Sequence, residues 1–152
     1  MISRKPDFVI GDPNAPYLRR WWLTNRKRDM EKCKIYLHHI LRDDDDRAFH
    51  DHPSRSCSII LRGGYVEHLP NGVKKNRYAG HVIFRKAEQP HRLELHRDKN
   101  GQPIPAWTIF IFGPKIREWG FLCPNGWRHW REFTGVPEGQ EAKGDERGRG
   151  CE

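Results

Sequence analysis

The chain has 152 residues, with 28 Lys and Arg against 20 Asp and Glu, and hydrophobic residues make up only 36% of it. This length favours one domain, and six Trp, seven Phe and four Tyr can still form a core, which argues against disorder throughout. No apolar run approaches the ~20 residues of a membrane-spanning helix, and the first residues lack the apolar segment of a signal peptide. We therefore expect a soluble, cytoplasmic protein with no membrane association.

The apolar residues between positions 18 and 134 come in short clusters that are separated by Gly, Pro, Asn and Asp. Hardly any stretch keeps a helical period over three turns, so the pattern predicts β-strands. In chain order, the expected strands span residues 35–41, 57–62, 65–68, 81–85, 92–96 and 107–112. Two short helices are expected over residues 24–34 and 127–133. Strands this short and regular are typical of an all-β sandwich or barrel.

The composition changes at Gly135, because the last eighteen residues contain five Gly and eight charged residues and no large apolar side chain. We expect residues 1–134 to form one domain and residues 135–152 to form a disordered tail that adds nothing to the core. The whole chain has a net charge of +8 and the tail has a net charge of −2, so residues 1–134 carry a net charge of +10. A domain this basic favours anionic partners.

The four cysteines are far apart and form no CxxC pair: Cys33, Cys57, Cys123 and Cys151. This spacing is more typical of reduced thiols in a cytosol than of a disulfide framework. We expect neither a disulfide nor a structural zinc site.

The segment from Phe49 to Pro53 reads FHDHP and contains His50 and His52. Residues two apart in an extended chain share a face, so the two imidazoles are expected to project together, as metal ligands do. The alternative is a chance pair of histidines on a solvated turn.

The spacing of the surrounding residues resembles the cupin family of small jelly-roll proteins. The first cupin motif, G-x5-HxH-x(3,4)-E-x6-G, matches in length the run from His50 through Cys57 to Gly64. The second motif, G-x5-PxG-x2-H-x3-N, matches in length the run from Gly80 to His91, and the spacer of fifteen residues is typical of compact cupins. The wider sequence resembles uncharacterised cupins of phage and bacterial genomes. The resemblance implies an all-β double-stranded β-helix, a jelly-roll barrel with one or two short peripheral helices.

The same resemblance implies a metal site made of His50, His52 and His91. Cys57 stands where the motif has its glutamate, so we expect three histidine ligands without a carboxylate. Such a site suits Fe(II), which we favour, or Zn, Ni or Mn. Three-histidine sites occur in the thiol-dioxygenase branch of the cupins, although Cys57 itself is better explained as a small buried side chain.

Alternation along the strands predicts what surrounds this site. If Cys57 points inward, Ile59 and Leu61 do so too, and Leu93 and Leu95 accompany His91, which gives the site apolar walls. Histidine ligands need an acceptor for their other ring N–H, and three carboxylates are candidates: Asp46, Asp51 and Glu67.

Three residues are expected to take part in chemistry at the site: His39, Glu67 and Arg85. His39 or its neighbour His38 is a candidate acid or base, as is Glu67, and Arg85 can pair with an anionic substrate, as can Arg92 and Arg117. Three classes of function stay open: a metal-dependent oxygenase, a metal-dependent isomerase or lyase acting on a phosphorylated or sugar-like compound, and a ligand-binding protein without catalysis. The ligand that we favour is a small anionic molecule, because the domain is basic.

Arginines flank tryptophans in two clusters, around Trp21 and Trp22 and around Trp127 and Trp130. Such clusters can bind single-stranded nucleic acid. We favour the alternative, in which these tryptophans are packed in the core and in the interface of a homodimer, and we do not expect nucleic acid as a partner.

Overall fold

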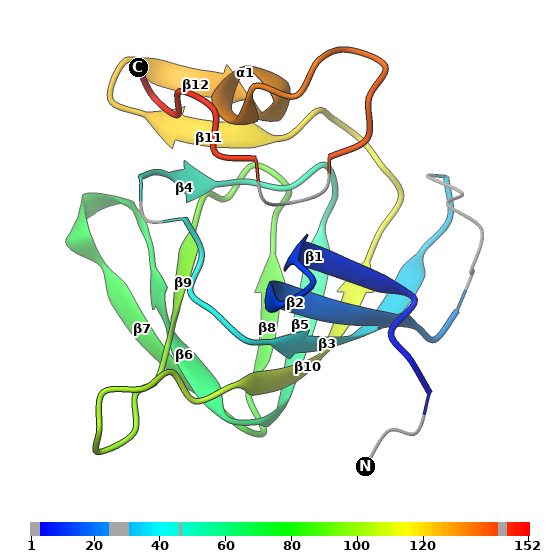
Figure 1. Cartoon of the computed structure of the whole chain (residues 1–152), viewed down its shortest axis with the longest axis vertical. Coiled ribbons are helices and arrows are strands. Elements are labelled where there is room, and N and C mark those ends of the chain that lie inside the picture. Colours follow the sequence, from blue (N-terminus) through cyan, green and yellow to red (C-terminus); the bar gives the residue numbers. More distant parts are fainter. Residues whose placement is uncertain (1–3, 25–30, 46, 143–145) are drawn as a thin grey trace.

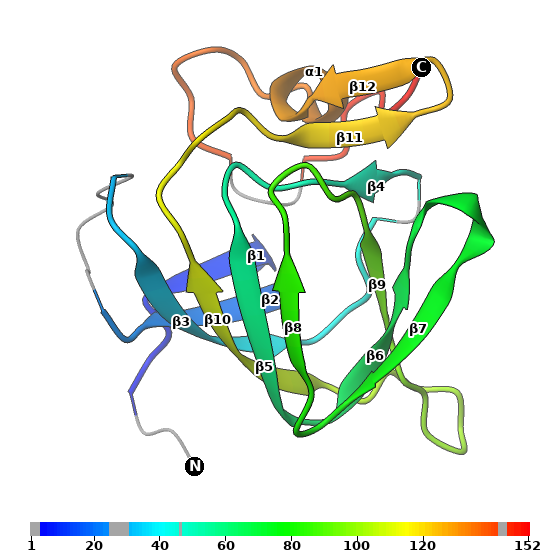
Figure 2. The ribbon, with the colours of Figure 1, turned by 180° about the vertical axis from the view of Figure 1, so that it is seen from behind.

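The computed structural model describes residues 4–24, 31–45, 47–142 and 146–152. Its strands form three sheets in which every pair is antiparallel (Figures 1 and 2). The six-stranded sheet has the order β1 (Phe8–Asp12), β2 (Ala15–Trp22), β3 (Lys34–Ile40), β10 (Ala106–Phe112), β5 (Ser56–Arg62) and β8 (Val82–Arg85). The all-β fold is confirmed, and each of the six expected strands lies within a residue of its predicted bounds.

Two three-stranded sheets complete the molecule. One has the order β7 (Lys74–Tyr78), β6 (Gly64–His68) and β9 (Arg92–Leu95), and together with the six-stranded sheet it surrounds a common interior (Figure 2). The other has the order β12 (Gly126–His129), β11 (Gly120–Cys123) and β4 (Phe49–His50). It lies at one end of the barrel beside the short helix α1 (Trp130–Thr134) (Figure 1). A 3₁₀ turn, η1 (Pro70–Gly72), lies between β6 and β7 in the sequence.

The main core fills the space between the six-stranded sheet and β6 and β9. Its members include Leu18, Ile60 and Ile83 from the large sheet, and Tyr65 and Leu95 from the small one. A second cluster, of Ala48, Phe121, Cys123 and Phe133, lies between β11 and α1 at the end of the barrel.

The outer face of the six-stranded sheet is also apolar. One row of cross-strand neighbours consists of Val82, Ile59, Ile109, Leu37 and Trp21. Both faces of this sheet therefore carry apolar side chains.

The two expected helices differ from the structure. Residues 25–30 of the first lie outside the described part of the chain, and β3 already begins at Lys34. The second is half correct, because Gly126–His129 pairs with β11 as a strand and only Trp130–Thr134 is helical. Among the described residues, no helix has the length and apolar character that crossing a membrane would require.

Cys123 and Cys151 form a disulfide, so the expectation of four reduced thiols is wrong. Cys33 and Cys57 are free. The structure also attaches the end of the chain to the barrel end, since Val136 and Gly150 are buried and Gly150 N donates to Phe133 O. The domain boundary at residue 134 stays a prediction. The described residues after it, however, make contacts with the rest of the chain, which a disordered tail would not make.

The tryptophans of the two basic clusters are packed to different degrees. Trp21 is buried, Trp22 and Trp130 are half-buried, and Trp130 stacks on Trp119 with ring centroids 5.7 Å apart. Trp127 is 45% exposed, so within this chain it is not packed in the core.

Candidate metal centre

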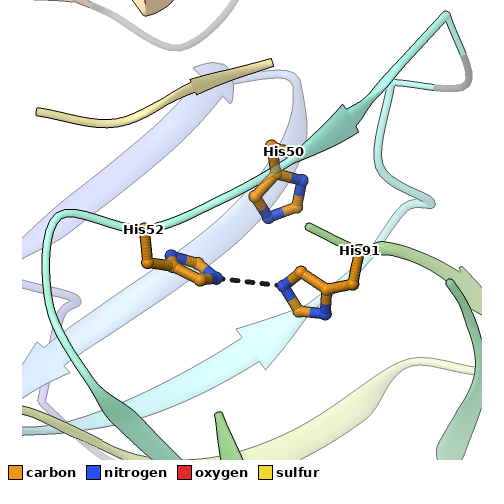
Figure 3. A group of neighbouring side chains, drawn as sticks. All are labelled: His50, His52 and His91. Atoms are coloured by element: carbon orange, nitrogen blue, oxygen red, sulfur yellow. Dashed lines mark hydrogen bonds between the residues drawn. The ribbon is translucent and has the colours of Figure 1, made fainter. Parts of the chain in front are cut away.

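Main-chain pairing brings His50 and His91 together although they are far apart in the sequence. The two residues form an antiparallel bridge in which each N–H donates to the other's carbonyl, both at 2.9 Å. Side chains of directly opposed residues lie on the same face of a sheet. His52 joins them because it is two residues from His50 (Figure 3).

The ring nitrogens of the three histidines converge on one small volume. One nitrogen from each ring lies within 4.8 Å of the other two, and His52 Nε2 is 3.0 Å from His91 Nε2. His91 is buried, and the other two rings are half-buried. The structure therefore brings together the three histidines that the sequence singled out, in an arrangement that can hold a metal ion.

Glu67 orients the most buried of these rings. Its carboxylate is completely buried, and Oε1 lies 3.0 Å from His91 Nδ1 and 2.6 Å from Arg85 Nε, while Oε2 accepts from Arg77 Nε at 2.8 Å. Burial raises the pKa of Glu67, but hydrogen bonds from His91 and Arg85 and the charge of Arg85 outweigh it, so the pKa is well below its usual value. The ionised carboxylate keeps the proton of neutral His91 on Nδ1, which leaves Nε2 free of hydrogen and able to bind a metal.

His50 faces a second carboxylate. Asp44 Oδ2 lies 3.7 Å from His50 Nδ1, and the same carboxylate accepts hydrogen bonds from the hydroxyl of Tyr17 and from Leu93 N. Of the acceptors expected from the sequence, Glu67 serves His91, Asp51 points away from the rings, and Asp46 lies outside the described residues.

Burial keeps the rings of His91 and His52 neutral at ordinary pH. It lowers the pKa of His91 to about 4, with the charges of His50 and Arg85 acting in the same direction against the hydrogen bond to Glu67. Burial also lowers the pKa of His52 well below 6.5, helped by His91 and His50. Neutral imidazoles can bind a metal, and protonated ones cannot.

We expect the metal-free protein to lose stability as the pH falls from about 6.5 to 4. The unfolded chain takes up a proton at His91 below its ordinary pKa of 6.5, whereas the folded chain takes it up only near 4. The free energy of unfolding should therefore drop by roughly 3 kcal/mol from this residue alone. Urea unfolding at pH 7 and pH 4.5 measures the drop, and His91→Gln should make it smaller whereas His81→Ala, at an exposed site, should not. Equal unfolding free energies at the two pH values would contradict this account.

The three rings open into a cavity of about 440 Å³ between the six-stranded sheet and the sheet of β7, β6 and β9. Its walls are largely aromatic and aliphatic, including Phe8, Ile10, Trp22, Leu93, Phe110 and Phe112. Of the lining residues other than histidine, Arg20, Lys34 and Arg85 carry positive charge and Asp44 carries negative charge. An apolar cavity with an excess of positive charge favours a small anion with an apolar body.

His39, expected at the site, lies on the other face of β3. Its ring stacks on Trp107 with centroids 4.0 Å apart, and it does not line the cavity. His38 lines the cavity instead, where Arg20 Nε donates to His38 Nε2 at 2.9 Å. Burial and the charge of Arg20 lower the pKa of His38 well below its ordinary value, so its ring is neutral.

Arg85 lines the cavity as expected, but its guanidinium is bound to three partners: Glu67, Ser58 and Tyr65. These contacts suit a residue that fixes Glu67 better than one that grips a substrate. Glu67 itself does not line the cavity, and neither do Arg92 and Arg117.

The register of β5 differs from the expectation by one residue. Ser58 lines the cavity and Ile60 packs in the core, whereas Cys57, Ile59 and Leu61 belong to the outer face. Cys57 therefore does not stand beside the histidines. The expectation for the other wall is met, because Leu93 lines the cavity and Leu95 is buried in the core.

Sequence reasoning missed the cavity residues of β2 and the start of β3, namely Arg20, Trp22, Lys34 and Tyr36. A signal was available, because Leu18, Arg20 and Trp22 are two residues apart and therefore lie on the same face of a strand.

Comparison with family models and with curated proteins finds no match. Solved structures do match. A cupin-like protein from Thermotoga maritima has a TM-score of 0.55 and 13% identity, over 92% of this chain and 99% of that one. An uncharacterised conserved protein with a double-stranded β-helix domain from Klebsiella pneumoniae has a TM-score of 0.51 and 18% identity, over 74% and 90%.

A third match is to the FeII form of HppE, with a TM-score of 0.54 and 18% identity, over 74% of this chain and 60% of that one. Identities this low establish the fold and leave the activity open. The chain has the cupin fold, a double-stranded β-helix of the jelly-roll type.

Proposed function

We propose that His50, His52 and His91 hold a divalent transition metal, and that the chain is a metal-dependent enzyme, oxygenase-like, acting on a small anionic molecule. The observation that supports this is the convergence of three imidazoles at the wall of a cavity, with Glu67 fixing the tautomer of one of them. Three nitrogen donors suit Fe(II), Zn, Ni or Mn. The likeness to FeII HppE favours Fe(II) among them.

A metal bound to three protein ligands keeps open positions, so it would supply Lewis-acid or redox chemistry to a substrate in the cavity. The chain's own residues would do the rest. Phe110 and Phe112 would exclude water, and Arg20 and Lys34 would attract the anion. The acceptor nitrogen of neutral His38 already receives a hydrogen bond from Arg20, so His38 would hold Arg20 in place at the cavity wall.

Elemental analysis of protein purified without a nickel column tests the metal. We expect close to one equivalent per chain in the wild type and little in His91→Ala. The matched control is His81→Ala, which removes an exposed histidine outside the site and should keep the wild-type content. Wild-type metal content in His91→Ala, or none in the wild type with added Fe(II), Zn(II), Ni(II) or Mn(II), would contradict the proposal.

Oxygen consumption tests the reaction class. Iron-loaded protein that consumes dioxygen in the presence of small carboxylates or phosphorylated compounds would support the oxygenase. Turnover of a phosphorylated or sugar-like compound without dioxygen would indicate an isomerase or lyase.

A further inference from the structure

The segment that carries His50 and His52 is held from outside the barrel by a separate lobe. This C-terminal lobe consists of β11, β12, α1 and the residues that follow, and it has its own small core around Phe121 and Phe133, whose rings stack at 3.7 Å. The disulfide between Cys123 and Cys151 joins β11 to the last residues of the chain. In Figure 1 the lobe covers one end of the barrel, with β4 between the two.

The lobe touches the histidine segment directly through the main chain. Strand β11 pairs with β4, so that Phe121 stands opposite His50 and Leu122 opposite Phe49. The rings of Phe121 and His50 are in edge contact, with centroids 6.4 Å apart. The backbone of His50 is thus bonded to His91 on one side and belongs to the lobe's sheet on the other.

Asp51, the residue between the two histidines, makes the strongest link. Its carboxylate is almost completely buried and accepts three hydrogen bonds, two from the lobe and one from Arg117 in the segment that leads into β11. Gly120 N donates to Oδ1 at 2.7 Å, and Arg117 Nη1 and Trp127 Nε1 donate to Oδ2 at 2.5 and 2.9 Å. Asp51 N donates in turn to Gly120 O at 3.0 Å.

The geometry of an extended chain separates these roles cleanly. His50 and His52 project toward His91, and Asp51, between them, projects the other way into the lobe. A buried carboxylate that receives a guanidinium, an indole N–H and a backbone N–H has little freedom to move. Its position therefore fixes the position of both neighbouring rings.

We propose that Asp51 is the positioning residue of the metal centre and that it makes the C-terminal lobe a redox-sensitive clamp on His50 and His52. This inference rests on the proposed function, since it concerns the affinity of the same three histidines for a metal. Asp51 acts through the backbone and does not touch the metal.

The redox step is the reduction of the Cys123–Cys151 disulfide by a dithiol. The S–S bond breaks, two electrons and two protons yield two thiols, and the reductant becomes a disulfide. Strand β11 then loses its covalent link to the last residues of the chain. As a result, β11 would hold β4 and Asp51 less firmly. Metal affinity falls while Glu67 and His91, on the barrel side, keep their contacts.

Titration with Co(II) measures this effect, because the visible spectrum of the bound ion reports its donor set as well as its affinity. Asp51→Ala should bind Co(II) about 10–100-fold more weakly than the wild type, as loss of a residue that orients ligands does elsewhere. Its spectrum should shift, because the rings are no longer held in one arrangement. The matched control is Asp98→Ala, which removes a carboxylate that holds the loop between β9 and β10 and should leave affinity and spectrum unchanged.

A milder variant keeps the test decisive if Asp51→Ala does not fold. Trp127→Phe removes one donor to Asp51 from a half-exposed ring and should weaken Co(II) binding by a smaller factor. Wild-type affinity and spectrum in a folded Asp51→Ala, or in Trp127→Phe where Asp51→Ala is unfolded, would overturn the positioning role.

The redox part is tested by the double variant Cys123→Ser/Cys151→Ser, which avoids thiol reagents that bind the metal themselves. It should bind Co(II) more weakly than Cys33→Ser, whose thiol is exposed and free. Equal affinity of the two would overturn the clamp's sensitivity to reduction. If the wild type binds no Co(II) at all, the proposed function fails; if the wild type binds and the variants bind equally, only this inference fails.

Discussion

Glu67→Gln is expected to lower the free energy of unfolding by about 3–5 kcal/mol, the cost of breaking a buried ion pair from one side. The substitution keeps the volume of the side chain but removes its charge. Arg85, itself only 4% exposed, would keep a buried positive charge whose carboxylate partner is gone. Arg77 would lose the same partner at the edge of the site.

Urea unfolding of the metal-free protein measures this loss as a lower midpoint with an unchanged slope. The matched control is Glu118→Gln, because Glu118 pairs with Lys115 and His129 at the surface, where an ion pair is worth about 1 kcal/mol or less. The same small loss in both variants would show that the network around Glu67 does not stabilise the fold.

Removal of the disulfide is the second large effect, with an expected loss of about 3 kcal/mol in Cys151→Ser. The bond closes a loop between residues 28 apart, so its loss enlarges the conformational freedom of the unfolded chain. Deletion of residues 138–152 should cost at least as much, since it also removes the buried Gly150 and its contact with Phe133.

Thermal or urea unfolding under non-reducing conditions compares these variants with Cys33→Ser, which should match the wild type. A melting temperature unchanged by the deletion would instead support the sequence-based expectation of a tail without contacts. The melting temperature after the deletion therefore distinguishes the two expectations, because one predicts a decrease and the other predicts no change.

The strands could be predicted from the sequence, but the direction of their side chains could not. In β5, the inward residues are Ser56, Ser58 and Ile60, and the outward ones are Cys57, Ile59 and Leu61. Hydrophobicity favours the wrong set, because the outward residues of β5 are more apolar than the inward ones, two of which are serines. A period of two identifies a strand, but it does not show which side faces the interior when the outer side is apolar as well.

The same ambiguity explains why His39 of β3 was expected at the site when His38 lines the cavity. Each shares its face with apolar neighbours, and only the pairing with β10 and β2 shows that His38 faces the cavity. The histidine cluster was easier to predict, because the resemblance to the cupin motifs implies His50, His52 and His91 together without a decision about the faces of the strands.

Other strands were missed because their residues are polar or few. Strand β7 reads KKNRY and is mostly exposed, and β4 has only two residues. Strand β2 directs Arg20 into the cavity, which interrupts the apolar alternation that marks a strand. The disulfide was missed for a related reason, because a bond between cysteines 28 residues apart leaves no local pattern.

The bridge between His50 and His91 lies at a seam, since one residue belongs to the lobe's sheet and the other adjoins β9 of the small sheet. An ion held there would cross-link chain segments that two main-chain hydrogen bonds otherwise join. At a concentration 100 times the Kd, it would add about 2.7 kcal/mol to the folded state. A chain made while metal is scarce would then open more often at this seam and be degraded sooner, so the supply of metal would set the protein's abundance as well as its chemistry.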